Sequence, residues 1–115
     1  MKNQLPAPPA HLSASCREWW QTVLNDYDLQ PHHLRLLQLA AEAWDRCSQA
    51  RAVLDAEGLT YETRFGAPVP RPEVAIERDS RLAFARLLRE LDLDVEPPTE
   101  PRPRPAPLRS NNRRR

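Results

Sequence analysis

Histidine and cysteine are the residue types of this 115-residue chain that most often act as catalysts or metal ligands. The histidines are His11 and the adjacent pair His32 and His33. Adjacent helical residues point about 100° apart, whereas helical metal ligands are spaced four residues apart, so the pair does not suit a metal. The cysteines, Cys16 and Cys47, form no CxxC pair. We predict reduced core thiols rather than a disulfide, no metal and no cofactor.

Sequence motifs of common catalytic sites are absent as well. The chain contains no GxSxG nucleophile turn, no Walker-type phosphate loop and no HExxH pair. Its only glycines are Gly58 and Gly66, which excludes a glycine-rich loop around a phosphate. Most acidic residues are interleaved with arginines, as on a solvated surface. We therefore predict that the protein is not an enzyme.

Arginine is the remaining residue type with a chemical role, because its guanidinium group binds phosphate. One set lies on one side of a predicted helix: Arg78, Arg81, Arg86 and Arg89. Because acidic residues lie nearby, an ordinary solvated helix face is the alternative interpretation of this set. A second set lies in a C-terminal segment with few acids: Arg102, Arg104, Arg109, Arg113, Arg114 and Arg115. Both sets are candidate DNA-binding residues, and a solubilising tail is the alternative for the second.

The elements that must position these residues begin with a short helical segment. Residues 1–12 contain three prolines and are predicted to form an extended N-terminal arm. A first helix over 15–27 begins with a capping box of Ser15 and Glu18. Its apolar face recurs at helical spacing: Cys16, Trp19, Trp20, Val23, Leu24 and Tyr27. Pro31 then starts a long second helix, which stops at Gly58.

The second half of the chain is predicted to contain a hairpin, a helix and a tail. Residues 59–70 alternate apolar and polar side chains around Gly66, as in a small β-hairpin. A third helix runs from residue 72 or 73 to 91. Its core face is Ile76, Ala83, Phe84, Leu87, Leu88 and Leu91. Residues 94–115 repeat proline and arginine, which predicts a disordered tail with polyproline II character.

The expected fold is therefore mainly α: an antiparallel helix pair with a long central helix, a hairpin and a third helix, with residues 13–93 as the folded domain. The apolar side of the second helix covers roughly 200°, more than the short first helix can bury. We predict that a neighbouring copy covers part of it, through Leu36, Leu39, Ala43, Trp44, Cys47, Ala50 and Leu54. Arg51 lies inside this arc, and Asp55 is its predicted ion-pair partner.

The order of these features resembles the small subunits of phage terminases. The resemblance covers residues 9–95 and rests on Pro9-Ala10-His11-Leu12, Trp19, Leu29 before a long helix ending at Ala56-Glu57-Gly58, the hairpin with Gly66, Pro72, and Arg89-Glu90-Leu91-Asp92-Leu93. The last segment is similar to the family's "eLGL" ending, with Asp92 in place of glycine. This departure concerns how the third helix ends.

The resemblance implies a non-catalytic, ring-forming homo-oligomer that recognises double-stranded viral DNA in the host bacterial cytoplasm. It also implies delivery of that DNA to a large subunit that carries the ATPase and nuclease. We expect no membrane contact, since no signal peptide or long apolar run is present. Two alternatives remain open: a helical protein–protein adaptor without DNA binding, and a small dimeric DNA-binding regulator. The second helix is too long and too apolar to favour a helix-turn-helix.

Overall fold

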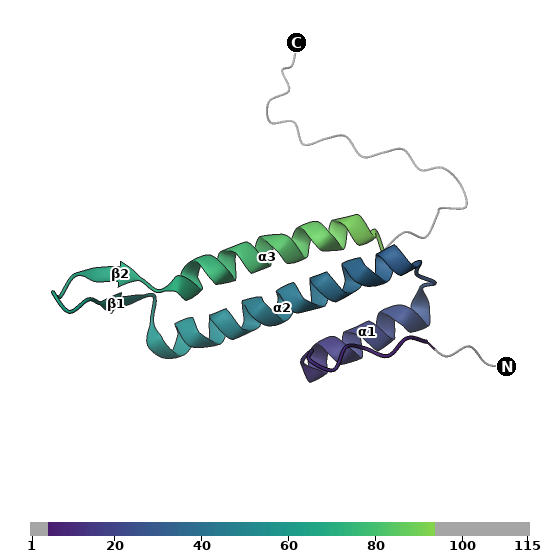
Figure 1. The fold of residues 1–115 in the computed structure, drawn as a ribbon, viewed down its shortest axis with the longest axis horizontal. Helices are drawn as coiled ribbons and strands as arrows, with labels where there is room; N and C mark the ends of the chain where they lie inside the picture. The colour runs from purple at the N-terminus through teal and green to yellow at the C-terminus, as the bar shows by residue number, and fades with distance from the viewer. Residues whose placement is uncertain (1–4, 94–115) are drawn as a thin grey trace, which may run out of the picture.

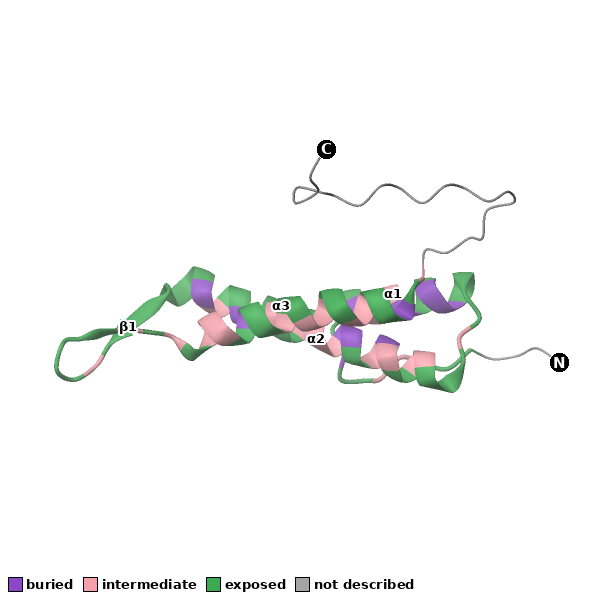
Figure 2. Cartoon of the chain, turned by 90° about the horizontal axis from the view of Figure 1, so that it is seen from above, coloured by how far each residue is buried: buried purple, intermediate pink, exposed green. Residues whose placement is uncertain are grey.

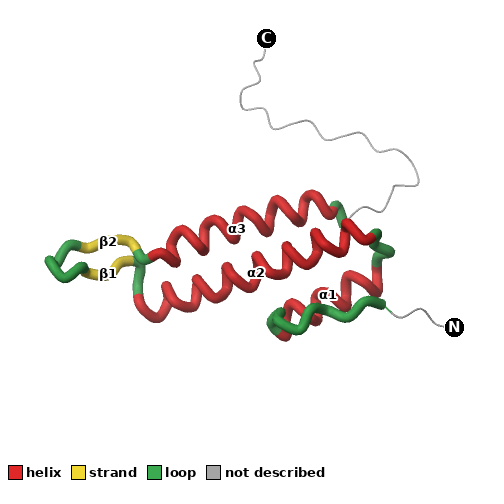
Figure 3. Tube along the Cα trace, in the orientation of Figure 1, coloured by secondary structure: helices red, strands yellow, loops and turns green. Residues whose placement is uncertain are grey.

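The computed structural model describes residues 5–93, which form three helices and one two-stranded hairpin (Figure 1). In chain order the elements are α1 (Ala14–Asp26), α2 (Pro31–Glu57), β1 (Thr60–Glu62), β2 (Pro68–Pro70) and α3 (Pro72–Leu91). Helices α2 and α3 run antiparallel and side by side, and α1 packs along the N-terminal half of α2 (Figure 3). The mainly helical fold is confirmed. The prediction of a disordered tail falls on residues 94–115, outside the described residues.

Local signals set the ends of α2 and the turn of the hairpin, as predicted. Pro31 occupies the first turn of α2, and Gly58 ends it with a φ of 92°. In the hairpin, Gly66 has a φ of 81°, and Tyr61 pairs with Val69 across the two antiparallel strands. Each strand is only three residues long. The ladder stays short because Pro68 and Pro70 have no N–H to donate.

The start of α1 differs from the prediction. Ser13 is the N-cap, and its hydroxyl oxygen accepts a hydrogen bond from the Cys16 N–H at 3.2 Å. The predicted capping box of Ser15 and Glu18 is therefore wrong. The physical reason is a tertiary contact: both the N–H and the hydroxyl of Ser13 donate to the Asp45 carboxylate of α2, at 2.8 and 2.6 Å.

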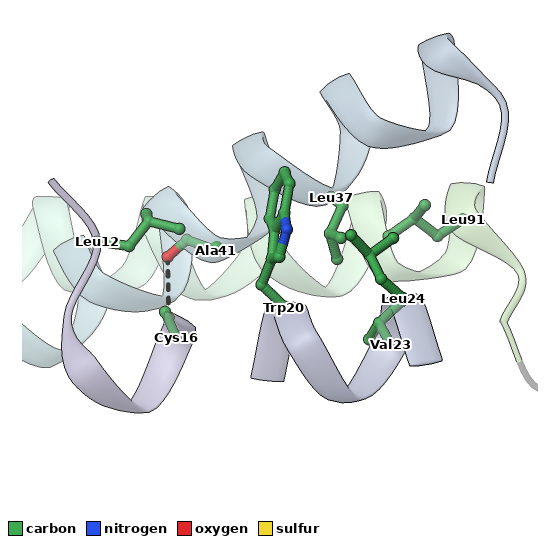
Figure 4. Close-up of a cluster of buried hydrophobic side chains, with 8 residues drawn as sticks. All are labelled: Leu12, Cys16, Trp20, Val23, Leu24, Leu37, Ala41 and Leu91. Atoms are coloured by element: carbon green, nitrogen blue, oxygen red, sulfur yellow. Dashed lines mark hydrogen bonds between the residues drawn. The ribbon is translucent and has the colours of Figure 1, made fainter. Parts of the chain in front are cut away.

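The hydrophobic core lies where the arm, α1, α2 and the C-terminal end of α3 meet (Figure 4). Its buried members are Leu12, Cys16, Trp20, Val23, Leu24, Leu37, Ala41 and Leu91. The predicted extended arm therefore also contributes a core residue, Leu12. The arm is held further by the Trp20 indole N–H, which donates to the Pro6 carbonyl at 3.0 Å. Tyr27, expected on the core face of the first helix, is exposed beyond its end.

Helix α3 packs along α2 but leaves part of its predicted core face open. Ile76 is 38% exposed, because α1 does not reach the end of the helix pair near the hairpin (Figure 2). The buried side chain in this turn is Glu77. At the other end, Asp92 ends α3 in the left-handed conformation, with φ 53° and ψ 51°. A glycine adopts that conformation without steric cost, which explains why the family's ending suits this position.

Candidate nucleic-acid and oligomer surfaces

The four candidate arginines of α3 differ in what they contact. Arg81 pairs with Glu77 one turn earlier, and Arg78 lies 3.2 Å from Asp79 in an exposed pair. Arg86 and Arg89 are exposed, and neither forms a salt bridge within residues 5–93. An exposed pair such as that of Arg78 holds its partners weakly. Three of the four guanidinium groups are therefore available to an external phosphate, whereas the fourth, that of Arg81, is bound to Glu77 within the fold.

Glu77 is the centre of the ion-pair group that occupies Arg81. This buried carboxylate accepts hydrogen bonds from Arg81 and from Arg51 of α2, the latter at 3.4 Å. The hydrogen bond from Arg81 lowers the pKa of Glu77, against the opposing effect of burial. Arg51 also contacts Asp55 at 3.4 Å, which confirms the predicted pair. Sequence spacing alone could have found the Glu77–Arg81 pair, since four residues separate its members.

An aromatic groove lies between the three helices, and we define it by Trp19, Trp44 and Phe84. The Phe84 ring centroid lies 5.2 Å from that of Trp44, edge-on, and 6.0 Å from that of Trp19. On one side is a cavity of about 270 Å³, lined by Ser15, Cys16, Trp19, Trp44 and Phe84. On the other is one of about 190 Å³, lined by Trp44, Cys47, Ser48, Arg51, Glu77, Arg81 and Phe84.

The oligomer candidates of α2 divide into covered and open residues. Ala50 and Leu54 are buried within the chain itself, and Leu36, Ala43 and Cys47 are half-buried. Leu39 is 50% exposed and Trp44 is 47% exposed. The apolar arc of α2 is wider than the short α1 can bury, but α3 covers a large part of it. Leu39 and Trp44 are thus the candidates with a substantial free surface.

Both thiols are free; Cys16 lies in the core, as predicted, whereas Cys47 is half-buried and outside the core cluster. The Cys16 thiol is buried and donates to the Ala41 carbonyl at 3.4 Å (Figure 4). Burial raises its pKa to about 11. Burial likewise raises the pKa of Cys47, whose sulfur lies 3.7 Å from the Glu77 carboxylate. Thiols with raised pKa values are protonated at neutral pH, so neither has the thiolate character of a nucleophile.

The histidines lie apart in two places. The rings of His32 and His33 lie next to each other at the start of α2, with centroids 4.2 Å apart and planes tilted by 42°. His11 lies in the arm, where its Nε2 is 2.7 Å from the Glu42 carboxylate. Residues 5–93 contain no cluster of three potential metal ligands. In the same part of the chain, no helix combines the length and apolarity needed to cross a membrane.

The structure also reveals features that sequence reasoning missed. The links from the arm to α2, His11–Glu42 and Ser13–Asp45, join residues 31 and 32 positions apart, so no local pattern reports them. At the hairpin tip Phe65 is 85% exposed, with the Arg64 guanidinium 5.3 Å from its ring centroid. The alternation of apolar and polar residues that predicted the hairpin does not indicate this exposure.

These observations define a small helical protein with exposed arginines on α3 and an open aromatic groove between its helices. Residues 17–99 match the family model described as phage terminase, small subunit. Since the match covers well over half of the chain, the protein belongs to the phage terminase small subunit family. No match was found among curated proteins or among solved structures.

Proposed function

We propose that this chain assembles into a closed ring of identical subunits, binds double-stranded viral DNA and delivers it to the large terminase subunit. The ATPase and nuclease belong to that large subunit, so this role requires no catalysis by the present chain. We expect the ring to act in the host bacterial cytoplasm. The observation that carries the proposal is the family match over residues 17–99. Two surfaces of the described residues support it.

The first surface is the open side of α2 around Leu39. A half-exposed leucine in the middle of a long helix leaves apolar area in water, at a cost of roughly 25 cal/mol for each Å². Leu39 lies five residues from Trp44, so the two side chains point about 140° apart around α2. A neighbouring copy can therefore cover Leu39 without entering the aromatic groove. When each copy makes the same contact with the next copy around a rotation axis, the copies form a closed ring.

The second surface is the row of available arginines on α3, Arg78, Arg86 and Arg89. At about 100° per residue they share an arc of roughly 80°, and at about 1.5 Å per residue they span some 16 Å of the helix. Guanidinium groups so arranged can contact successive phosphates of one DNA strand. The arginines at 102, 104, 109, 113, 114 and 115 lie outside the described residues, and we propose that they add to the same contact.

Salt-dependent DNA binding tests this proposal. Replacing both Arg86 and Arg89 by alanine should make the slope of log affinity against log salt shallower by about 0.9 for each phosphate that the variant no longer neutralises. The double replacement of Arg35 and Arg46 by alanine is the matched control, since both are exposed and the change removes the same charge from another helix. The slope is measured by fluorescence anisotropy with labelled duplex DNA, and native mass spectrometry gives the assembly state. An unchanged slope in the Arg86 and Arg89 variant would disprove a DNA-binding role for this row.

A protein–protein adaptor is the second candidate, and the open aromatic groove is the observation that favours it. Aromatic-lined grooves bind proline-rich segments, because such segments already adopt the polyproline II conformation and lose little conformational entropy on binding. An intact oligomer that binds no DNA even at low salt would support the adaptor. A native mass of two subunits, with a palindromic DNA site, would instead support a dimeric regulator.

A further inference from the structure

The aromatic groove continues along α3 to the point where the described chain ends. A third cavity, of about 570 Å³, is lined by Phe84, Ala85, Leu88, Arg89, Asp92 and Leu93. Phe84 also lines the two cavities beside Trp44, so the three cavities adjoin. Leu93 is the last described residue. The groove therefore opens directly at the exit of the C-terminal segment.

The groove is apolar in its middle and carries both arginines and acids towards its ends: Arg89 with Asp92 near the exit of the chain, and Arg51 and Arg81 with Glu77 at the far end. Trp44 is half-exposed there, although a tryptophan is a large apolar side chain that packing would stabilise. Arg89 lines the cavity near the exit of the chain. At the far end Arg51 and Arg81 share the buried carboxylate of Glu77, and Arg51 also contacts the exposed Asp55. A fitting occupant would carry apolar groups in its middle and acids spaced to meet these arginines.

The segment that leaves Leu93 has this pattern, since its sequence from residue 94 is Asp-Val-Glu-Pro-Pro-Thr-Glu-Pro. From Asp92 back to Glu77 is fifteen helical residues, or about 22 Å at roughly 1.5 Å per residue. A proline-rich chain in the polyproline II conformation rises about 3.1 Å per residue, so about seven residues cover that distance. Seven residues after Leu93 the chain reaches Glu100, which would lie at Arg51 and Arg81.

We propose that residues 94–101 occupy this groove of their own chain and run back along α3. Val95, Pro97 and Pro98 contact Leu88, Phe84 and Trp44, and Glu100 contacts the two arginines at the far end. An independent observation agrees: the family match continues past the described residues to position 99. The shared family pattern thus includes most of the length that the groove can hold. The proposal does not depend on ring formation or DNA binding.

A cross-link to a native thiol tests the proposal in the full chain. Cys47 lines the groove beside Glu77, opposite the place where the segment would end. The variant Thr99→Cys, oxidised with glutathione disulfide, should form a disulfide with Cys47 within one chain. It should form at least about tenfold faster than in the matched control Ser110→Cys, because a docked residue has a higher effective concentration. Peptide mapping identifies the bonded cysteines, and circular dichroism confirms equal helical content.

Each other outcome decides against the proposal. The reaction is run at an alkaline pH at which Cys47 of the wild type forms a mixed disulfide with glutathione, because burial raises the pKa of this thiol. Equally slow cross-linking of the two variants under that condition would show that the segment does not occupy the groove. Disulfide-linked pairs of chains, seen on a non-reducing gel, would show that a second copy's segment lies there instead. Adding Glu100→Arg to the Thr99→Cys chain should slow the intramolecular reaction several-fold, because a third positive charge would face Arg51 and Arg81. An unchanged rate would show that Glu100 does not contact Arg51 and Arg81.

Discussion

Asp45 joins the start of α1 to α2 through one carboxylate. It accepts hydrogen bonds from the N–H and hydroxyl of Ser13 and lies 3.3 Å from the Cys16 sulfur. Burial raises the pKa of Asp45, but the hydrogen bonds from Ser13, together with the contacts to Cys16 and His11, outweigh it and leave the pKa below its usual value. The unfolded chain therefore binds this proton more tightly. The resulting stabilisation is fully present above the unfolded pKa of about 3.9 and is lost as the pH falls through the lower folded value.

We expect Asp45→Asn to lower the free energy of unfolding by about 1–2 kcal/mol at pH 7, because the variant cannot form the charge-assisted hydrogen bonds to Ser13. The difference from the wild type should begin to shrink below about pH 4, where the carboxylate of the unfolded chain takes up a proton, and should vanish only below the lower pKa of the folded state. Urea unfolding followed by circular dichroism at pH 7 and pH 3 measures both values. Asp55→Asn, which alters an exposed pair on the same helix, is the control. A difference of equal size at both pH values would contradict the assigned role.

Among the residues that the structure describes, Asp92 is the only one other than glycine with a positive φ. We expect Asp92→Gly to stabilise the protein by about 0.5–1 kcal/mol, since glycine adopts the left-handed conformation freely and the change removes an acid from a helix C-terminus. The melting temperature should rise by roughly 2–8 °C. Asp92→Ala also removes the charge but adds no conformational freedom, so it should not stabilise to the same extent. A melting temperature of Asp92→Gly at or below that of the wild type would contradict the expectation.

At the scale of elements, α2 holds α1 on one side and α3 on another and still leaves Leu39 open. In the proposed ring a neighbouring copy covers that residue. Leu39→Asp would then bury an unpaired charge and should reduce the native mass towards that of one subunit. Helical content should remain, because Leu39 is exposed within the chain. Gln49→Asp, an exposed position on the same helix, should leave the mass unchanged. A full-sized assembly of Leu39→Asp would place the interface elsewhere.

Element boundaries were predictable where a local residue decides them. Pro31, Gly58 and Pro72 act within one turn of the backbone, and α2 and α3 begin and end where their positions indicate. The start of α1 was not predictable, because Asp45, 32 residues away, selects Ser13 as the cap. The candidate surfaces show the same contrast. Spacing placed the four arginines on one side of α3. Only the packing of α2 on α3 shows that Arg81 is bound to a buried carboxylate and that Ala50 and Leu54 are covered.

At the scale of the whole described molecule, packing is uneven along the long axis. The arm and all three helices meet at one end, whereas α2 and α3 alone continue towards the exposed hairpin (Figure 2). Regions with fewer buried apolar contacts open at a lower free energy than the rest of a protein. The hairpin end of the helix pair is therefore the part that should open first.

The placement of the tryptophans determines what an optical experiment on this protein can detect. Trp19, Trp20 and Trp44 all lie at the end that α1 covers, and the aromatic side chains of the hairpin are Tyr61 and Phe65. Intrinsic tryptophan emission therefore reports on the arm, the core and the groove. Fraying of the hairpin end changes the far-ultraviolet circular dichroism while leaving that emission nearly constant. A loss of ellipticity that precedes the shift in emission is then a signature of partial opening, and a single unfolding free energy cannot be read from either signal alone.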